Sequence, residues 1–207
     1  VARNYIKENS HAIGKPYVIA DKQAGAVYLF DADHNYLSQA PALFGANVSD
    51  AKTSGSTPAG RFSLSYTKYD QAPSYGGSIQ VFDKMPTIKD GVQEVFAMHR
   101  VINMPGEGRK GRLQSTTSAD NRISNGCINV PASFYDNHFD GNFDGFLYVI
   151  PETTNYTGNT FGVNPGGEPD VKYTQPVQVQ KAETVEVQKG APAEDVVKAA
   201  SDVVVEG

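Results

Sequence analysis

Short apolar runs separated by polar turns fill the first 151 residues of the chain. Runs rich in Val, Ile, Tyr and Phe and bounded by Gly, Pro, Asn and Asp are typical of β-strands. Residues 17–20 and 26–30 flank the polar segment 21–25, which predicts a hairpin. We expect further strands over six ranges: 42–46, 62–66, 78–82, 92–99, 127–130 and 146–150.

Three segments depart from this pattern. Residues 1–16 form a polar lead-in with room for one helical turn. Residues 131–139 predict a short helix, because Pro131 suits a first helical turn and is followed by apolar Phe134 and Tyr135. Residues 104–122 show no periodicity and are rich in Gly, Arg, Ser and Thr, which predicts a long loop of the kind that often carries function. A mainly β domain is therefore expected over residues 17–151.

The composition changes after Pro151. Residues 156–169 are rich in Gly, Asn and Pro, and from Thr174 onward there is no aromatic residue, Leu or Ile. Such a segment buries too little apolar surface to offset the entropy lost on ordering. We expect residues 152–207 to be an acidic, low-complexity linker or tail that is largely disordered.

Charge and cysteine content narrow the function classes. The net charge of −5 lies wholly in residues 152–207, and the rest of the chain is neutral. Residues 100–122 carry a net charge of +3, which suits either an anionic substrate or a solvated loop. The sequence pI of about 5.3 disfavours nucleic-acid binding. No stretch has the ~18 consecutive apolar residues of a membrane-spanning helix. The single Cys excludes an intramolecular disulfide.

The block 123–130 carries the sharpest chemical signal. Cys127 follows Gly126, opens an apolar run and precedes the expected helix. Glycine permits close backbone approach, and backbone amides beside a nucleophile can stabilise an oxyanion. The alternative is a buried free Cys that acts as a small hydrophobic residue.

A nucleophilic Cys needs a base that removes its proton. His99 is the best candidate, because it ends the expected strand 92–99 and a strand can aim it. His11, His34 and His138 lie in the lead-in, in a polar turn and on the helix after the Cys, respectively.

Three motifs in order resemble the catalytic domain of the L,D-transpeptidases, cysteine enzymes that crosslink bacterial peptidoglycan. They are the Thr-Pro-x-Gly-x-Phe turn at 57–62, the strand-borne His99, and the Ser-x-Gly-Cys-x-Asn block at 124–129. The first of them, taken alone, indicates only a turn that enters a strand. The resemblance covers about residues 16–151. It implies a β-sandwich-like domain with short helices and a long lid over the active site, here residues 104–122.

The resemblance also implies roles. Cys127 would be the nucleophile and His99 the base, with the backbone carbonyl of Arg100 beside the His. The amides of Gly126 and Cys127 would form much of the oxyanion hole. Ser124 and Asn129 would hold the Cys loop in shape.

Two features depart from the family pattern. Asn125 stands where many members have a His; because Asn does not titrate, we expect it to position groups rather than transfer protons. The separation of 28 positions from His99 to Cys127 exceeds the usual spacing, which we attribute to an insertion in the lid.

The basic lid suggests how substrate is held. Stem peptides of peptidoglycan carry free carboxylates, and Arg109, Arg112 or Arg122 could bind one as a bidentate pair. No metal or cofactor is expected. The segment 31–35 resembles the start of a calcium loop, but Tyr36 and Ala42 stand where that loop needs Gly and Glu.

The resemblance therefore implies an L,D-transpeptidase that transfers a stem-peptide acyl group to an amine, located in the periplasm or cell envelope or secreted. A hydrolase on the same domain is the first alternative: a carboxypeptidase, an amidase that releases a wall-attached protein, or a toxin that degrades peptidoglycan. A non-catalytic wall-binding module is the second. A wall-anchored protein is a further candidate acceptor. The chain begins at Val1 with no visible signal segment; we interpret it as a trimmed or mature chain, so this does not bear on compartment.

Overall fold

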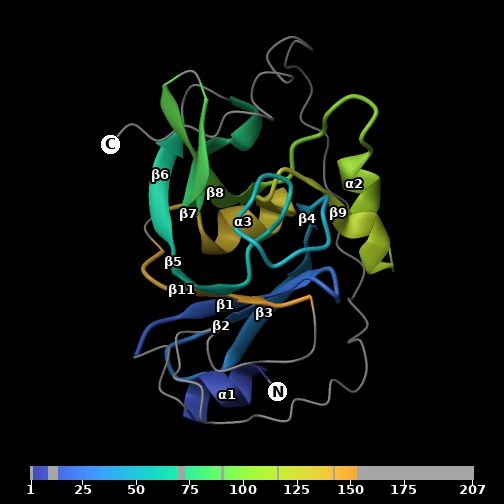
Figure 1. The fold of residues 1–207 in the computed structure, drawn as a ribbon. Coiled ribbons are helices and arrows are strands. Elements are labelled where there is room, and N and C mark those ends of the chain that lie inside the picture. The colour runs from blue at the N-terminus through green and yellow to red at the C-terminus, as the bar shows by residue number, and fades with distance from the viewer. Residues whose placement is uncertain are drawn as a thin grey trace.

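Two β-sheets organise the computed structural model, which describes residues 2–8, 14–69, 73–89, 91–115, 117–141 and 143–152. The first sheet has five strands in the order β3 (Tyr36–Pro41), β2 (Ala26–Phe30), β1 (Tyr17–Asp21), β11 (Phe146–Ile150) and β5 (Gly60–Ser63). The second sheet has four, in the order β10 (Ile128–Val130), β8 (Val92–Arg100), β7 (Gly77–Lys89) and β6 (Ser65–Tyr69). The described chain is mainly β, as the sequence predicts, with few and short helices (Figure 1).

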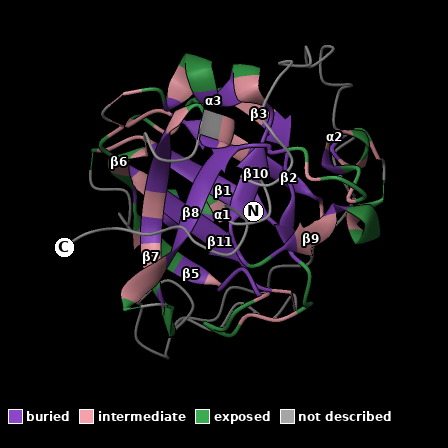
Figure 2. Cartoon of the chain, turned by 90° about the horizontal axis from the view of Figure 1, so that it is seen from above, coloured by how far each residue is buried: buried purple, intermediate pink, exposed green. Residues whose placement is uncertain are grey.

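The main core lies between these sheets. Val18 and Leu29 of the first sheet belong to one buried cluster with Phe96 and Met98 of the second. Helix α3 (Ala132–His138) adds Phe134 to the same cluster, so the predicted helix after the Cys packs into the core. Figure 2 shows buried residues along the central strands and exposed residues mainly on loops and at the ends of elements.

The second sheet positions the candidate site through one short parallel pair. All three residues of β10 pair with the last three residues of β8, with Ile128 opposite Met98 and Asn129 opposite His99. Cys127 comes directly before β10. It therefore lies beside the part of β8 that precedes Met98 and is no longer paired with β10. This register brings the Cys beside the strand that carries the His.

The lead-in packs onto the outer face of the first sheet. Helix α1 (Ala2–Glu8) buries Tyr5 and Ile6, which cluster with Tyr17 and Tyr148 of strands β1 and β11 (Figure 1). This helix is longer than the single turn expected from the sequence. Only two of its residues are buried, which is too few to give a clear helical pattern.

Several elements differ from their expected bounds. Strand β3 was not expected, because it is an edge strand that starts with exposed residues and ends on Pro41, both weak strand signals. The expected strand 62–66 is divided at Leu64 into β5 and β6, which lie in different sheets. The expected strand 42–46 shortens to β4 (Phe44–Gly45), which pairs with β9 (Arg122–Ser124).

The predicted lid contains structure of its own. Residues 104–122 include helix α2 (Arg109–Arg112), the 3-10 turn η2 (Ser118–Asn121) and the first residue of β9. A second 3-10 turn, η1 (Pro73–Tyr75), precedes β7. The predicted tail after Glu152 lies outside the described residues. Among the described helices, none has the length and apolar character needed to cross a membrane.

Candidate active site

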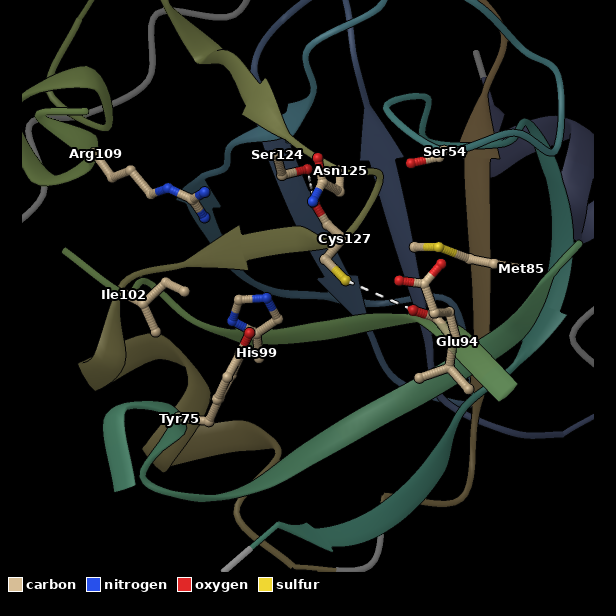
Figure 3. A pocket seen from close by; sticks show the side chains of 11 residues that line it. Ser54, Tyr75, Met85, Glu94, His99, Ile102, Arg109, Ser124, Asn125 and Cys127 are labelled. Atoms are coloured by element: carbon tan, nitrogen blue, oxygen red, sulfur yellow. Dashed lines mark hydrogen bonds between the residues drawn. The ribbon is translucent and has the colours of Figure 1, made fainter. Parts of the chain in front are cut away.

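A pocket opens beside the start of β10, and its volume of about 420 Å³ includes open solvent. Both chemical candidates from the sequence, Cys127 and His99, line it (Figure 3). The other lining residues come from β7, β8, β9, η1, α2 and three loops: Ser54, Tyr75, Met85, Glu94, Val95, Ile102, Arg109, Ser124 and Asn125.

The Cys loop is held by a chain of buried hydrogen bonds. Ser124 Oγ donates to the Cys127 carbonyl at 2.6 Å and accepts the Gly126 N–H at 3.0 Å. Thr57 Oγ1 donates to the Gly126 carbonyl at 2.9 Å and accepts the Gly45 N–H at 2.8 Å. The upstream turn therefore packs against the Cys loop and fixes it, a role that the turn alone could not indicate.

The backbone conformation and the close packing at position 126 both require a glycine. Its φ of +125° lies in the region that side chains rarely adopt, and a Cβ there would lie 2.6 Å from the Phe96 ring and 2.7 Å from the Ser56 carbonyl. Its N–H, expected as an oxyanion donor, is instead engaged by Ser124 Oγ. The Gly126 N–H would have to leave this bond to reach an oxyanion, so the expected pair of donors, Gly126 and Cys127, stays a prediction.

The Cys127 thiol lies along the edge of β8. Its Sγ is 3.9 Å from the Val95 carbonyl oxygen, to which it donates, and the Ala97 N–H acts on it as a hydrogen-bond donor. The residue is 8% exposed, so the sulfur is shielded but reaches the pocket. Burial raises the pKa of the Cys127 thiol to about 11, while the Ala97 N–H and the charge of Arg109 act in the opposite direction.

The His99 ring is fixed by its neighbours. Its Nδ1 lies 2.7 Å from the carbonyl oxygen of Arg100, which can only accept, so Nδ1 carries the proton and Nε2 carries the lone pair. The Tyr75 ring meets it edge-on with ring centroids 4.6 Å apart. Burial lowers the pKa of His99 to about 4; the Arg100 carbonyl opposes this shift and Arg109 adds to it.

These two shifts define the resting state. With the pKa of His99 lowered and that of Cys127 raised, the thiol keeps its proton and the imidazole is neutral around pH 7. The pair is therefore not a preformed thiolate–imidazolium pair, and the proton has to move when the sulfur attacks. A neutral His99 is the form that can accept it.

Asn129 links the His to the lid. It is fully buried, and its Oδ1 accepts from Arg109 Nη1 at 2.9 Å. Its Nδ2 lies 3.5 Å from His99 Nε2. Arg109 also contacts Glu107, with Nε 2.5 Å from Oε2, so α2 is joined to the strand that carries the site.

The remaining predicted residues separate into two groups. Ser124 and Asn125 line the pocket, whereas Arg112 and Arg122 do not. Arg112 donates to the backbone carbonyls of Glu107 and Asp120. Arg122 makes a bidentate ion pair with Glu152 at 2.6 and 2.7 Å.

Arg122 belongs to a buried network behind the Cys loop. Lys22 is fully buried, and its Nζ lies 2.7 Å from Asp50 Oδ1 and 3.4 Å from Glu152 Oε1. It also donates to the carbonyl of Thr57 at 2.8 Å. This network joins the turn after β1, the turn around Thr57 and the end of β11, so Arg122 supports the site from outside the pocket.

Sequence reasoning missed four pocket residues of chemical interest: Tyr75, Met85, Glu94 and Ile102. Tyr75 precedes the strand β7, and Glu94 lies within an expected strand, so neither stands in a recognisable motif. Among the other histidines, His34 and His138 are not pocket residues, and His11 lies outside the described residues. In the described part of the chain, no group of three or more His, Cys, Asp or Glu residues could hold a metal ion.

No family model and no curated protein matches the sequence. Among solved structures, the chain is similar to an L,D-transpeptidase from Xylanimonas cellulosilytica, with 15% identity, a TM-score of 0.39, and coverage of 66% of this chain and 61% of that one. It is also similar to an L,D-transpeptidase from Mycobacterium smegmatis, with 20% identity, a TM-score of 0.39, and coverage of 66% and 58%.

A third similar structure is the helical cell shape determining protein Pgp2 from Campylobacter jejuni, with 19% identity, a TM-score of 0.41, and coverage of 67% and 48%. The chain spans less than two thirds of the length of each of these three structures. Similarity at this level assigns no residue role. The chemistry of this chain therefore depends on its own geometry.

Proposed function

We propose that the protein is a peptidoglycan L,D-transpeptidase that works through an acyl-enzyme on Cys127. The observation that carries this proposal is the shared pocket of Cys127 and His99, in which the Arg100 carbonyl fixes the tautomer of the His. The ordered motifs at 57–62 and 124–129 support it, since Thr57 and Ser124 both hold the Cys loop.

The first half-reaction forms a thioester. As Cys127 Sγ attacks a peptide carbonyl of the donor stem, His99 Nε2 accepts the thiol proton. The same proton passes to the leaving amine when the C–N bond breaks. The Cys127 N–H is the backbone donor available to the developing oxyanion. Because His99 rests neutral, this step begins without a prior deprotonation of the base.

The second half-reaction releases the acyl group. An acceptor amine loses a proton to His99 Nε2 and attacks the thioester, and the sulfur leaves as the C–S bond breaks. Transfer to an amine gives a crosslink, and transfer to water gives a trimmed stem. Both outcomes use the same thioester, so acceptor binding decides between them.

Substrate contacts fall on the walls of this pocket. Ser124 and Asn125 lie beside the sulfur, and Arg109 is the basic residue of the lid that lines the pocket. We assign recognition of a donor carboxylate to Arg109 in place of Arg112 and Arg122, because Arg109 lines the pocket and those two do not. Such a substrate places the protein in the cell envelope.

Incubation with a purified tetrapeptide-stem muropeptide tests this function. Mass analysis should detect crosslinked dimers, with trimmed monomers as the hydrolytic side product. The Cys127→Ala protein should give neither. Trimmed monomers alone from the wild-type protein would favour the hydrolase alternative, and product from Cys127→Ala would refute the mechanism.

A further inference from the structure

The pocket carries opposite charges on its two sides. Figure 3 shows Arg109 on one side of the Cys127 sulfur and Glu94, with Met85, on the other. Both charges act on the thiol: Arg109 lowers the pKa of Cys127 and Glu94 raises it. A ligand that spans the sulfur therefore meets a cation at one end and an anion at the other.

The two charges are not equally compensated within the protein. Arg109 is 5% exposed and is already bonded to the Glu107 carboxylate and to Asn129. Glu94 is half-buried and accepts a hydrogen bond from the Thr87 hydroxyl. Among the described residues, no Lys, Arg or His forms an ion pair with Glu94. A partly desolvated carboxylate without a cation favours a cationic ligand group.

We propose that Glu94 binds the ammonium group of the acyl acceptor and holds its nitrogen next to the Cys127 thioester. This inference rests on the proposed function and assigns the contact with the acceptor amine to a residue of this chain. Water cannot form an ion pair with Glu94. The residue therefore favours attack of the amine on the thioester, which gives a crosslink, over attack of water, which gives hydrolysis.

The proton balance of the transfer is consistent with this placement. The acceptor ammonium first releases one proton to solvent, which leaves a neutral amine with a free electron pair. The nitrogen attacks the thioester carbonyl and the C–N bond forms, while His99 Nε2 accepts the second proton of the nitrogen. The C–S bond breaks, and His99 passes that proton to the departing sulfur, which restores the Cys127 thiol and the neutral imidazole.

A binding experiment tests the inference without turnover. The Cys127→Ala protein is titrated calorimetrically with a tripeptide stem that has one free side-chain amine, and with the same peptide after N-acetylation of that amine. We expect the free amine to bind about tenfold more tightly. Adding Glu94→Gln should remove this difference, whereas adding Asp144→Asn, which removes an exposed surface carboxylate, should preserve it.

A partition experiment tests the consequence. With a fixed donor stem, Glu94→Gln should raise the apparent KM for the acceptor peptide about tenfold and shift product from dimer to trimmed monomer. Hydrolysis of the donor without acceptor is measured on the same variant, to separate an effect on the acceptor from an effect on the donor. A parallel fall in donor-only turnover would assign Glu94 to the donor and overturn the inference.

The two proposals fail in different ways. Equal binding of free and acetylated amines to Cys127→Ala overturns only the role of Glu94, as does amine selectivity that survives Glu94→Gln. If no adduct forms on wild-type Cys127 with the donor stem, the proposed function itself is overturned.

Discussion

His99 Nδ1 lies 2.7 Å from the carbonyl oxygen of Arg100, the next residue in the chain. The side chain of that Arg100 is itself fixed, with its guanidinium bonded to Asp136 at 2.6 Å and to the Tyr75 carbonyl at 3.0 Å. One residue thus anchors the end of β8 through its side chain and sets the His tautomer through its backbone. The ring is held in its base form before any substrate binds.

Burial of a neutral His99 makes folding sensitive to acid. Its pKa is about 4 in the folded protein and 6.5 when unfolded, so the unfolded state binds the proton first as pH falls. The stability contribution is fully present above pH 6.5 and is lost as pH falls through 4. Relative to His99→Gln, we expect the wild type to lose about 3 kcal/mol between these values.

Urea unfolding of both proteins at pH 7 and pH 4 measures this difference. The carboxyl groups are the same in both proteins, so their contribution to the pH dependence cancels in the comparison. Parallel stability curves would mean that His99 is solvated and does not carry the lowered pKa.

The raised pKa of Cys127 predicts slow alkylation at neutral pH. Because the thiolate is the reactive form and the thiol titrates near 11, iodoacetamide labelling should be slow at pH 7 and rise steeply above pH 9. His99→Gln should change this profile little, since the imidazole rests neutral. Mass-detected labelling rates across pH provide the measurement. Fast labelling at pH 7 that is lost in His99→Gln would instead reveal a preformed thiolate–imidazolium pair.

Thr57 should be essential to the Cys loop through its hydroxyl. Thr57→Val leaves the Gly45 N–H and the Gly126 carbonyl without this partner in a buried setting, which costs about 1–3 kcal/mol. We also expect a large fall in kcat, because the loop that carries the nucleophile loosens. Thr57→Ser keeps the hydroxyl and should retain most of both properties. A Thr57→Val protein with wild-type stability and turnover would contradict this role.

Arg122 and Arg112 should differ in what they stabilise. Arg122→Met breaks a buried ion pair and leaves Glu152 with Lys22 alone, so we expect a loss of about 3 kcal/mol in unfolding free energy. Arg112→Met removes bonds to two carbonyls at the protein surface and should change stability by about 0.5 kcal/mol or less. Thermal and urea unfolding of the two variants make the comparison. A larger loss for Arg112→Met, or a tenfold rise in its donor KM, would show that the lid arginines are misassigned.

The sequence predicted the elements with strong local signals. The hairpin of β1 and β2, the strand β8 that ends near His99 and the helix α3 follow from apolar periodicity and Pro131. Cys127 and His99 could be proposed from sequence motifs, because few residue types can act as a nucleophile or as a base. Strand β3 and the division between β5 and β6 escape such reasoning, because edge strands and sheet changes depend on packing with distant segments.

The walls of the pocket depend on long-range pairing. The register of β7 against β8 shifts at two places, between Val81 and Asp83 and between Lys84 and Ile88, near the region that supplies Met85 and Glu94. No local pattern encodes those shifts. The choice among three lid arginines likewise needs the fold, since Arg122 pairs with the distant Glu152 and Arg109 bonds to the distant Asn129 as well as to its neighbour Glu107.

Direct detection of the acyl-enzyme tests the central claim most simply. The wild-type protein is mixed with a tetrapeptide donor stem, quenched in acid, and examined by intact mass and peptide mapping. We predict one added acyl group on the peptide that contains Cys127, released by hydroxylamine as a thioester should be, and absent from Cys127→Ala. An unmodified Cys127 during turnover, or product formation by Cys127→Ala, would contradict the account.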